Sequence, residues 1–319
     1  MNVRRRLIPA AAVAAVTALG IGTLSACSGE STAATGTGKF DVVASFYPMA
    51  FLAERIGGDH VHVTTLTSPG QEPHDLEISP RQIASLEESD AVLYLKNLQP
   101  SVDDAVAQSP VATKIDAASL TALEEHGNEV GGHAAEHDTH AGGEGSGKDP
   151  HIWLDPVKYA QVAEGVGRAF EKADPEHAAD YKKNTAALVK RLDELNARFE
   201  KGLAHTESKV FITTHAAFGY LAERYGLTEE AINGLDPESE PSAARVRDLE
   251  KMAAADGVTT VFYETLVSDK TARTVAADAG LRTDVLDPLE GITDKSRGKD
   301  YFAVQEANLK ALQQALGAK

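Results

Sequence analysis

The sequence predicts an α/β fold of two Rossmann-like lobes with mostly parallel sheets, joined by one long rigid helix. Short apolar runs alternate with helical patterns in both halves of the chain, and a single long amphipathic stretch lies between the halves. A chain of 319 residues is also more often two domains than one. Strands that alternate with helices favour parallel sheets covered on both faces.

Strand and helix patterns follow one another through the first half. The expected strands are 41–46, 60–67 and 91–95, and the expected helices are 49–56, 80–88 and one that begins at Pro156. Ser79 and Pro80 give the helix at 80–88 a serine cap and a proline at its first position, which is a strong start signal. The order predicts β-α-β units.

The stretch from Pro175 to His205 is the expected joining helix. Its large apolar residues repeat at intervals of seven, four, three and four, which places them on one stripe; they are Tyr181, Leu188, Leu192, Leu195 and Phe199. At about 1.5 Å per residue the helix would be about 45 Å long, which is more than one small domain needs. We therefore expect it to link two lobes.

The same rhythm restarts in the second half. The expected strands are 209–213, 259–264 and 283–286, and the expected helices are 216–225, 242–255, 268–279 and one from about Tyr301. We thus expect an N-terminal lobe over 39–174, a linking helix over 175–206 and a C-terminal lobe over 207–319.

The N-terminus has the pattern of an export signal. Three arginines, an alanine-rich apolar run and small residues precede Cys27, which is the only cysteine in the sequence. This resembles the lipobox of bacterial lipoproteins, so we expect residues 1–26 to be removed and Cys27 to carry a lipid, with 27–38 as a flexible tether. The alternatives are an ordinary signal peptide or a short membrane helix, in either of which Cys27 has no role.

The charge of the chain argues against several classes of partner. The formal net charge is −17, and losing the three arginines of the signal would take it to about −20. Nucleic acid and anionic lipid headgroups are poor partners for such a surface. A cation is a better expectation.

Three histidines stand where predicted strands meet predicted helices: His74, His151 and His215. Ligands of open α/β sheets bind beyond the carboxyl ends of the strands, so these loops are the expected place of a site. Neutral imidazole suits zinc, and three protein ligands plus one further group are common for this ion. A lone histidine is more often a hydrogen-bonded core or surface residue; three in such loops favour a metal site between the lobes.

Residues 124–148 differ in composition from the rest of the chain. This segment is rich in glycine and acidic residues, has almost nothing to bury, and contains His126, His133, His137 and His140. We interpret it as a disordered insertion whose histidines form a second, weaker zinc site or attract the ion. A solvated loop with no metal role is the alternative. Residues 133–137 match the H-x-x-E-H metallopeptidase pattern, but a glycine-rich segment is not expected to form the helix that this pattern requires.

Four segments carry a specific family resemblance. They are PGQEPHD at 69–75, DPHIWLDP at 149–156, THAAFGY at 214–220 and LDPL at 286–289. In this order they resemble the metal-site segments of the cluster A-I solute-binding proteins of ATP-driven importers, and the resemblance covers 39–319. It implies two α/β lobes joined by a rigid helix, with Zn²⁺ or Mn²⁺ bound between them.

The resemblance also implies roles for single residues. His74, His151 and His215 match metal ligands, and Asp287 matches a carboxylate that can complete the coordination sphere. His215 stands where manganese proteins tend to have a carboxylate, which favours zinc. Pro73 departs from some zinc members, which have a glutamate there. The fourth ligand is therefore left open between Asp287, Glu72 and water.

By this resemblance the protein captures Zn²⁺ and delivers it to an ABC permease and its ATPase, from the outer face of the cytoplasmic membrane. We expect a monomer. We also expect no enzymatic activity, because no general base or substrate pocket is evident. Glu264 and Glu290 are candidates for orienting the imidazoles, and Trp153 is a candidate for packing beside them. Two alternatives remain: manganese transport, and a metal-dependent adhesin or surface sensor on the same scaffold.

Overall fold

The computed structural model describes residues 38–126 and 147–319. The expected signal peptide, Cys27 and most of the tether lie outside this part of the chain, as do His133, His137 and His140. Within it, no helix is both long enough and apolar enough to cross a membrane. Residues 38–319 form one compact unit.

The first half contains a parallel sheet in the order β2-β1-β3-β4. Its strands are β1 (Phe40–Ala44), β2 (Val61–Thr65), β3 (Ala91–Tyr94) and β4 (Thr113–Asp116), and its helices are α1 (Tyr47–Gly57), α2 (Pro80–Glu88), α3 (Pro100–Gln108) and α4 (Pro156–Ala173). The helix predicted from Ser79 begins there with a capping box, because Ser79 and Gln82 bond to each other's backbone N–H.

The second half repeats this arrangement in the order β6-β5-β7-β8, again parallel. Its strands are β5 (Val210–Thr213), β6 (Thr228–Ala231), β7 (Thr260–Tyr263) and β8 (Arg282–Val285), and its helices are α6 (Gly219–Arg224), α7 (Ala243–Ala255), α8 (Lys270–Ala279) and α9 (Tyr301–Leu316). The predicted α/β class and parallel sheets are confirmed.

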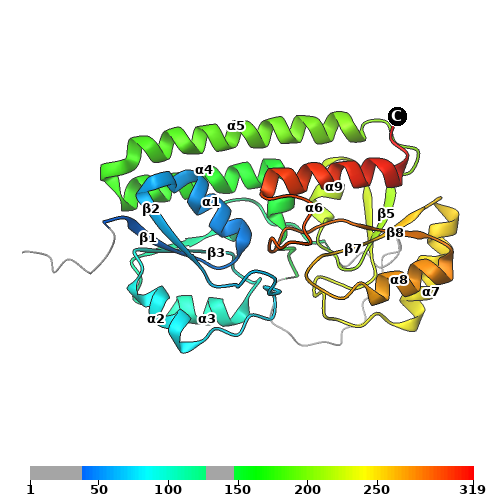
Figure 1. Cartoon of the computed structure of the whole chain (residues 1–319), viewed down its shortest axis with the longest axis horizontal. Coiled ribbons are helices and arrows are strands. Elements are labelled where there is room, and N and C mark those ends of the chain that lie inside the picture. Colours follow the sequence, from blue (N-terminus) through cyan, green and yellow to red (C-terminus); the bar gives the residue numbers. More distant parts are fainter. Residues whose placement is uncertain (1–37, 127–146) are drawn as a thin grey trace, which may run out of the picture. The chain divides into compact units, whose positions relative to one another are not determined.

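One long helix, α5 (Ala178–Leu203), lies between the two halves in the sequence. It packs on α1 and α4 of the first half and on α9 of the second, and Figure 1 shows it running alongside both sheets. All five residues of the predicted apolar stripe are buried. The helix therefore joins the two halves through packing on both, as its length suggested.

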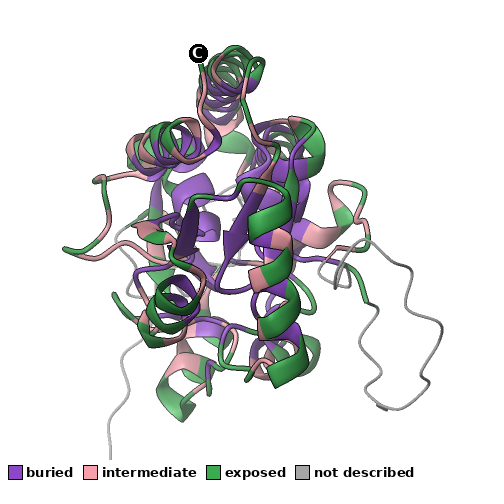
Figure 2. Cartoon of the chain, turned by 90° about the vertical axis from the view of Figure 1, so that its right-hand side faces the viewer, coloured by how far each residue is buried: buried purple, intermediate pink, exposed green. Residues whose placement is uncertain are grey.

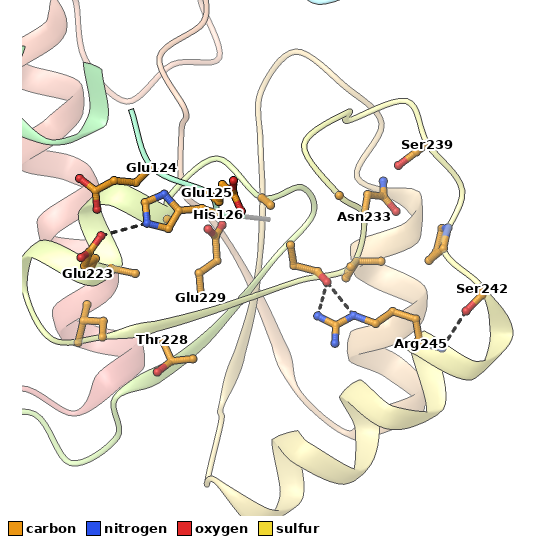
Figure 3. Close-up of a pocket in the computed structure, with 18 of the residues that line it drawn as sticks. Glu124, Glu125, His126, Glu223, Thr228, Glu229, Asn233, Ser239, Ser242 and Arg245 are labelled. Carbon is orange, nitrogen blue, oxygen red and sulfur yellow. Dashed lines mark hydrogen bonds and ion pairs between the residues drawn. The ribbon is translucent and has the colours of Figure 1, made fainter. Parts of the chain in front are cut away.

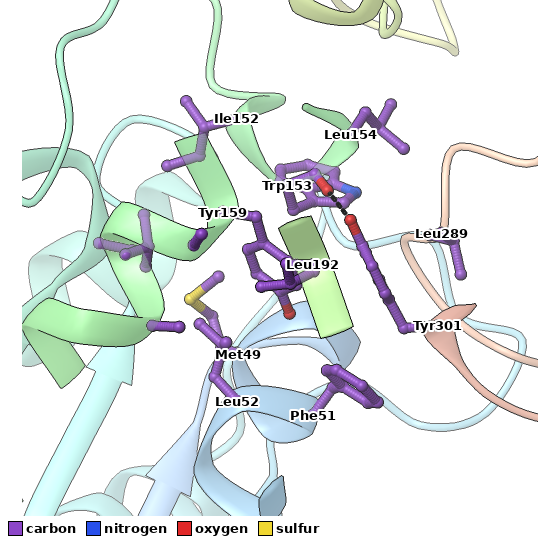
Figure 4. Close-up of a cluster of buried hydrophobic side chains, with 14 of the residues drawn as sticks. Met49, Phe51, Leu52, Ile152, Trp153, Leu154, Tyr159, Leu192, Leu289 and Tyr301 are labelled. Carbon is purple, nitrogen blue, oxygen red and sulfur yellow. Dashed lines mark hydrogen bonds between the residues drawn. The ribbon is translucent and has the colours of Figure 1, made fainter. Parts of the chain in front are cut away.

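The two halves also share a continuous apolar core. Figure 2 shows the strands buried inside helices whose outer faces are exposed. In Figure 4, side chains from α1, α4 and α5 gather with Trp153, Leu289 and Tyr301. Trp153 donates from Nε1 to the carbonyl of Pro288 at 2.7 Å, and Tyr301 donates from its hydroxyl to the carbonyl of Trp153 at 2.6 Å. These buried bonds fix the loop after β8 against the first half.

Three elements were not predicted: α3, β4 and β6. The strand β4 contains a single large apolar residue, Ile115, and β6 contains none, because its sequence is Thr-Glu-Glu-Ala. Short strands of this composition lack the apolar run that identifies a buried strand. Four 3₁₀ turns complete the described elements: Gly58–His60, Ala117–Ser119, Ile152–Leu154 and Pro175–His177.

Candidate metal centre

The three predicted histidines come from separate elements and meet at one point. His74 lies in the loop between β2 and α2, His151 precedes the 3₁₀ turn Ile152–Leu154, and His215 follows β5 directly. Each of the two parallel sheets thus sends a loop from a strand's carboxyl end to the same place, as expected for open α/β sheets. Ring centroids of the three imidazoles are 5.3–6.0 Å apart.

A fourth side chain, Glu290, lies at the centre of these rings. Its Oε1 is 3.2 Å from Nε2 of His74 and 3.5 Å from Nε2 of both His151 and His215. One ligand atom from each of the four residues lies within 4.8 Å of the other three. Only His74 is partly exposed, at 13% of its side chain. The arrangement is a nearly closed cage of three nitrogens and one carboxylate.

Several polar atoms in this cage have no hydrogen-bond partner among the described residues. They are Nε2 of His151, Nε2 of His215 and Oε2 of Glu290, all of which are buried. Burying a polar atom without a partner costs about 1–3 kcal/mol. Such atoms pointing at one another fit a bound cation, which would satisfy all of them at once.

The other nitrogen of each buried imidazole is held by a carboxylate. Nδ1 of His151 donates to Asp149 at 2.7 Å, and Nδ1 of His215 donates to Glu264 at 2.9 Å. Thr214 donates to the same oxygen of Glu264 at 2.8 Å. Carboxylates in this role fix the tautomer and leave Nε2 free to bind a metal. The expectation for Glu264 is therefore met.

The electrostatics of the cage favour positive charge. Burial alone would lower the pKa of His215, but Glu264 and Glu290 raise it well above its usual range. Burial would also lower the pKa of His151, but Asp149 raises it. Burial alone would raise the pKa of Glu290, yet the three imidazoles around its carboxylate hold it well below its usual range. A bound cation would supply the positive charge that these carboxylates favour.

Asp287 does not lie among the imidazoles, contrary to the expectation that it completes the site. Its carboxylate accepts the backbone N–H of Leu289 at 2.8 Å and the hydroxyl of Thr265 at 3.2 Å. Leu289 has φ +60°, an unusual conformation for a branched residue, and the hydrogen bond to Asp287 supports that turn. The next residue in the chain is Glu290. By supporting this turn, Asp287 positions the Glu290 carboxylate, which lies where the sequence had suggested Asp287.

Glu72 was the second candidate for the fourth ligand. Its two carboxylate oxygens accept the backbone N–H groups of His74, at 3.1 Å, and Asp75, at 3.2 Å. Burial, followed by the negative charge of Glu290, raises the pKa of Glu72. Glu72 therefore shapes the loop that carries His74, whereas Glu290 lies in contact with all three imidazoles.

A second group of potential ligands lies beside the first. His126, the described member of the predicted histidine-rich insertion, groups with Glu124 and Glu223 within 4.8 Å. Burial alone would lower the pKa of His126, but Asp149 and Glu223 raise it. The three residues lie at one end of a cavity of about 630 Å³ that Glu229 and Arg245 also line (Figure 3).

Trp153 and two histidines outside the cage have other surroundings. Trp153 packs beside His151, with ring centroids 5.1 Å apart. His60 and His62 lie outside the cage and are paired with Asp180 and Asp41, respectively, each of which is partly exposed.

The chain is similar to known proteins of zinc uptake. A profile of the family described as "Zinc-uptake complex component A periplasmic" matches residues 42–315. The chain is 35% identical over 297 residues to a "Zinc-binding lipoprotein AdcA" of Streptococcus pneumoniae, covering 91% of this chain and 58% of that protein. The chain thus spans little more than half the length of that relative. It is 33% identical to the "High-affinity zinc uptake system protein ZnuA" of Bacillus subtilis, covering 93% and 94% of the two chains.

The fold is likewise similar to solved structures. The crystal structure of the Zn(II)-bound ZnuA-like domain of Streptococcus pneumoniae AdcA matches with a TM-score of 0.72 and 32% identity. The match covers 88% of this chain and 99% of that domain.

Proposed function

The chain belongs to the family of zinc-uptake complex component A, and on this basis we propose that it captures Zn²⁺ outside the cell and delivers it to an ABC-type importer. One observation carries the proposal. Three imidazole Nε2 atoms approach Glu290 Oε1 at 3.2–3.5 Å in a cage where the described residues leave buried polar atoms unpartnered. A divalent cation satisfies these atoms better than any neutral ligand.

The ligands in this proposal are His74, His151, His215 and Glu290. Three nitrogens and one carboxylate match the four-coordinate preference of zinc. Manganese prefers sites richer in oxygen, so zinc is the better fit. With Glu290 as the fourth ligand, the metal has no open position for an activated water, and the site serves binding rather than hydrolysis.

The burial of the cage indicates how the ion is held and released. His74 is the most exposed of the ligands and lies in an irregular loop, whereas His151, His215 and Glu290 are buried. We propose that the ion enters and leaves on the His74 side. Because α5 packs on both halves, movement of this loop is favoured over wide opening of the lobes.

The partners follow from the same proposal. An importer of this class has a membrane permease that receives the ion and an ATPase that drives transport. We propose that a lipid on Cys27 holds the protein at the outer face of the membrane as a monomer, with 39–174 and 207–319 as its lobes. Replacing Cys27 with serine should release the protein into the medium; retention at the membrane would contradict the lipid anchor.

Competition with a chelator of known zinc affinity tests the central proposal. The purified protein should bind one tightly held Zn²⁺ equivalent at neutral pH in preference to Mn²⁺. A variant with His74, His151 and His215 all replaced by alanine should lose that equivalent. Displacement of zinc by manganese, or unchanged affinity in the triple variant, would overturn the proposal. An adhesin role would add a partner without changing this result.

A further inference from the structure

The group formed by Glu124, His126 and Glu223 lies apart from the cage and has its own ligand geometry. Nε2 of His126 is 3.1 Å from Oε2 of Glu223, and a carboxylate oxygen of Glu124 lies within 4.8 Å of both. In Figure 3 the two glutamates lie on the same side of the His126 ring. The three ligand atoms therefore face a common point.

The imidazole of His126 occupies a fitted position. A Cβ atom on Gly219 would come within 2.6 Å of the ring atom Cγ, so only glycine leaves room for the ring at that place. The ring also packs edge-on against Tyr220, with centroids 4.5 Å apart. The hydroxyl of Tyr220 donates to the carbonyl of Asp149 at 2.8 Å and accepts the backbone N–H of Glu124 at 2.9 Å. Residues from α6 thus hold His126 and Glu124 together.

Asp149 orients His126 in the same way that it orients a ligand of the first site. Its Oδ2 accepts from Nδ1 of His126 at 3.0 Å, while its Oδ1 accepts from Nδ1 of His151 at 2.7 Å. The Nε2 of His126 is thereby directed at Glu223. This is the carboxylate–imidazole arrangement that accompanies metal-binding histidines, and here one carboxylate supports two of them.

The negative charge around this group favours a cation. Lys158 contacts Glu124 Oε1 at 2.5 Å and balances one carboxylate. Asp149 and Glu223 place carboxylates on the two sides of the His126 ring, and Glu229 and Glu240 line the adjoining cavity together with Arg245. A negative cavity of this kind raises the local concentration of divalent cations.

We propose that Glu124, His126 and Glu223 form a second Zn²⁺ site, joined to the first through the shared carboxylate of Asp149. The site is more open than the first, because the Glu223 side chain is 60% exposed, and it offers one nitrogen and two carboxylates. It should therefore bind zinc more weakly and exchange it faster than the cage. His133, His137 and His140 are not required for it.

The test uses the mature chain with His74 and His215 replaced by alanine, which weakens the first site but keeps His151 and Asp149. Titration calorimetry with Zn²⁺ should still detect one equivalent. Adding Glu223→Gln or His126→Ala should weaken this binding at least about tenfold. The matched control is Glu125→Gln, which removes the same charge from a neighbouring residue of the cavity and should leave the affinity unchanged.

The outcomes separate this site from its alternatives. Glu223 is exposed, so its substitution tests the site even if His126→Ala disturbs folding, which circular dichroism would reveal. Equal losses in Glu223→Gln and Glu125→Gln would reduce the site to general negative charge and overturn the proposal. Loss of the equivalent on replacing His133, His137 and His140 with serine would assign it to those histidines instead. The result does not depend on whether the first site binds zinc.

Discussion

Asp149 accepts two hydrogen bonds from His151 on a single oxygen: Oδ1 lies 2.7 Å from Nδ1 and 2.9 Å from the backbone nitrogen. Neither side chain is exposed to solvent. The bond from the backbone nitrogen holds the Asp149 carboxylate in place, and the ring of His151 can turn only by breaking its own bond to that carboxylate. This fixes the direction of Nε2 before any ion arrives, so little ordering is left for the binding step.

Replacing Asp149 with asparagine should weaken zinc binding about 10- to 100-fold. The amide oxygen of asparagine can still accept from Nδ1, so the ring stays oriented, but the negative charge that makes imidazole a better ligand is lost. Chelator competition measures the effect. The exposed Asp75 provides a matched control, since Asp75→Asn removes the same charge close to His74. Similar losses in both variants would mean that only the overall charge matters.

The roles assigned to Glu290 and Asp287 predict different consequences for the same change. Glu290→Gln should reduce zinc affinity more than about 100-fold, because it removes the carboxylate that lies among the imidazoles, which is a larger effect than loss of an orienting partner. Asp287→Asn should reduce it less, since asparagine can still accept the N–H of Leu289. The ranking is measured by zinc competition on both variants. A greater loss in Asp287→Asn would restore Asp287 as the ligand.

These two residues also show how far the sequence could be interpreted. The three histidines were identifiable because each follows a strand or opens a helix, where parallel sheets place their ligands. The choice of Glu290 over Asp287 depends on a turn with φ +60° at Leu289, and nothing in a leucine indicates that conformation. Glu290 could therefore be proposed only as an orienting residue.

The secondary structure was likewise only partly predictable from the sequence. The predicted strands and helices had clear apolar runs or caps, such as Ser79 before α2. The strand β6 was missed because Glu229 and Glu230, both buried, look like surface residues in the sequence. Their burial depends on partners from β5, from Phe218 just before α6 and from α7, which only the folded chain brings near.

Zinc should stabilise the protein more at pH 8 than at pH 6. In the metal-free protein the pKa values of His151 and His215 are raised. Their contribution to stability is therefore fully present below the unfolded pKa of about 6.5 and is lost as pH rises through the folded pKa. Zinc needs neutral imidazoles, so its own contribution grows over the same range.

Thermal unfolding with and without zinc checks this pH dependence. The increase in Tm caused by zinc should grow steadily from pH 6 to pH 8. The variant His62→Ala, which removes an exposed histidine outside the cage, should show the same increase as the natural protein. A zinc effect that is constant with pH would mean that the imidazoles are already neutral without metal.

Glu229 and Glu230 are adjacent buried glutamates for which the same substitution should have opposite effects. Burial raises the pKa of Glu229 to about 7, despite hydrogen bonds from Thr213 and Phe218. A raised carboxyl pKa costs stability as pH rises from the unfolded value of about 4.3 to the folded one, so Glu229→Gln should stabilise the protein at pH 8 by up to about 3 kcal/mol and have little effect at pH 4. Glu230 instead pairs with the buried Arg245 at 2.9 Å, and Glu230→Gln should destabilise at pH 8 by about 2 kcal/mol. Urea unfolding of both variants at the two pH values gives the comparison. If Glu229→Gln destabilised the protein at pH 8, the hydrogen bonds that hold the His215 loop would outweigh the cost of burying the charge.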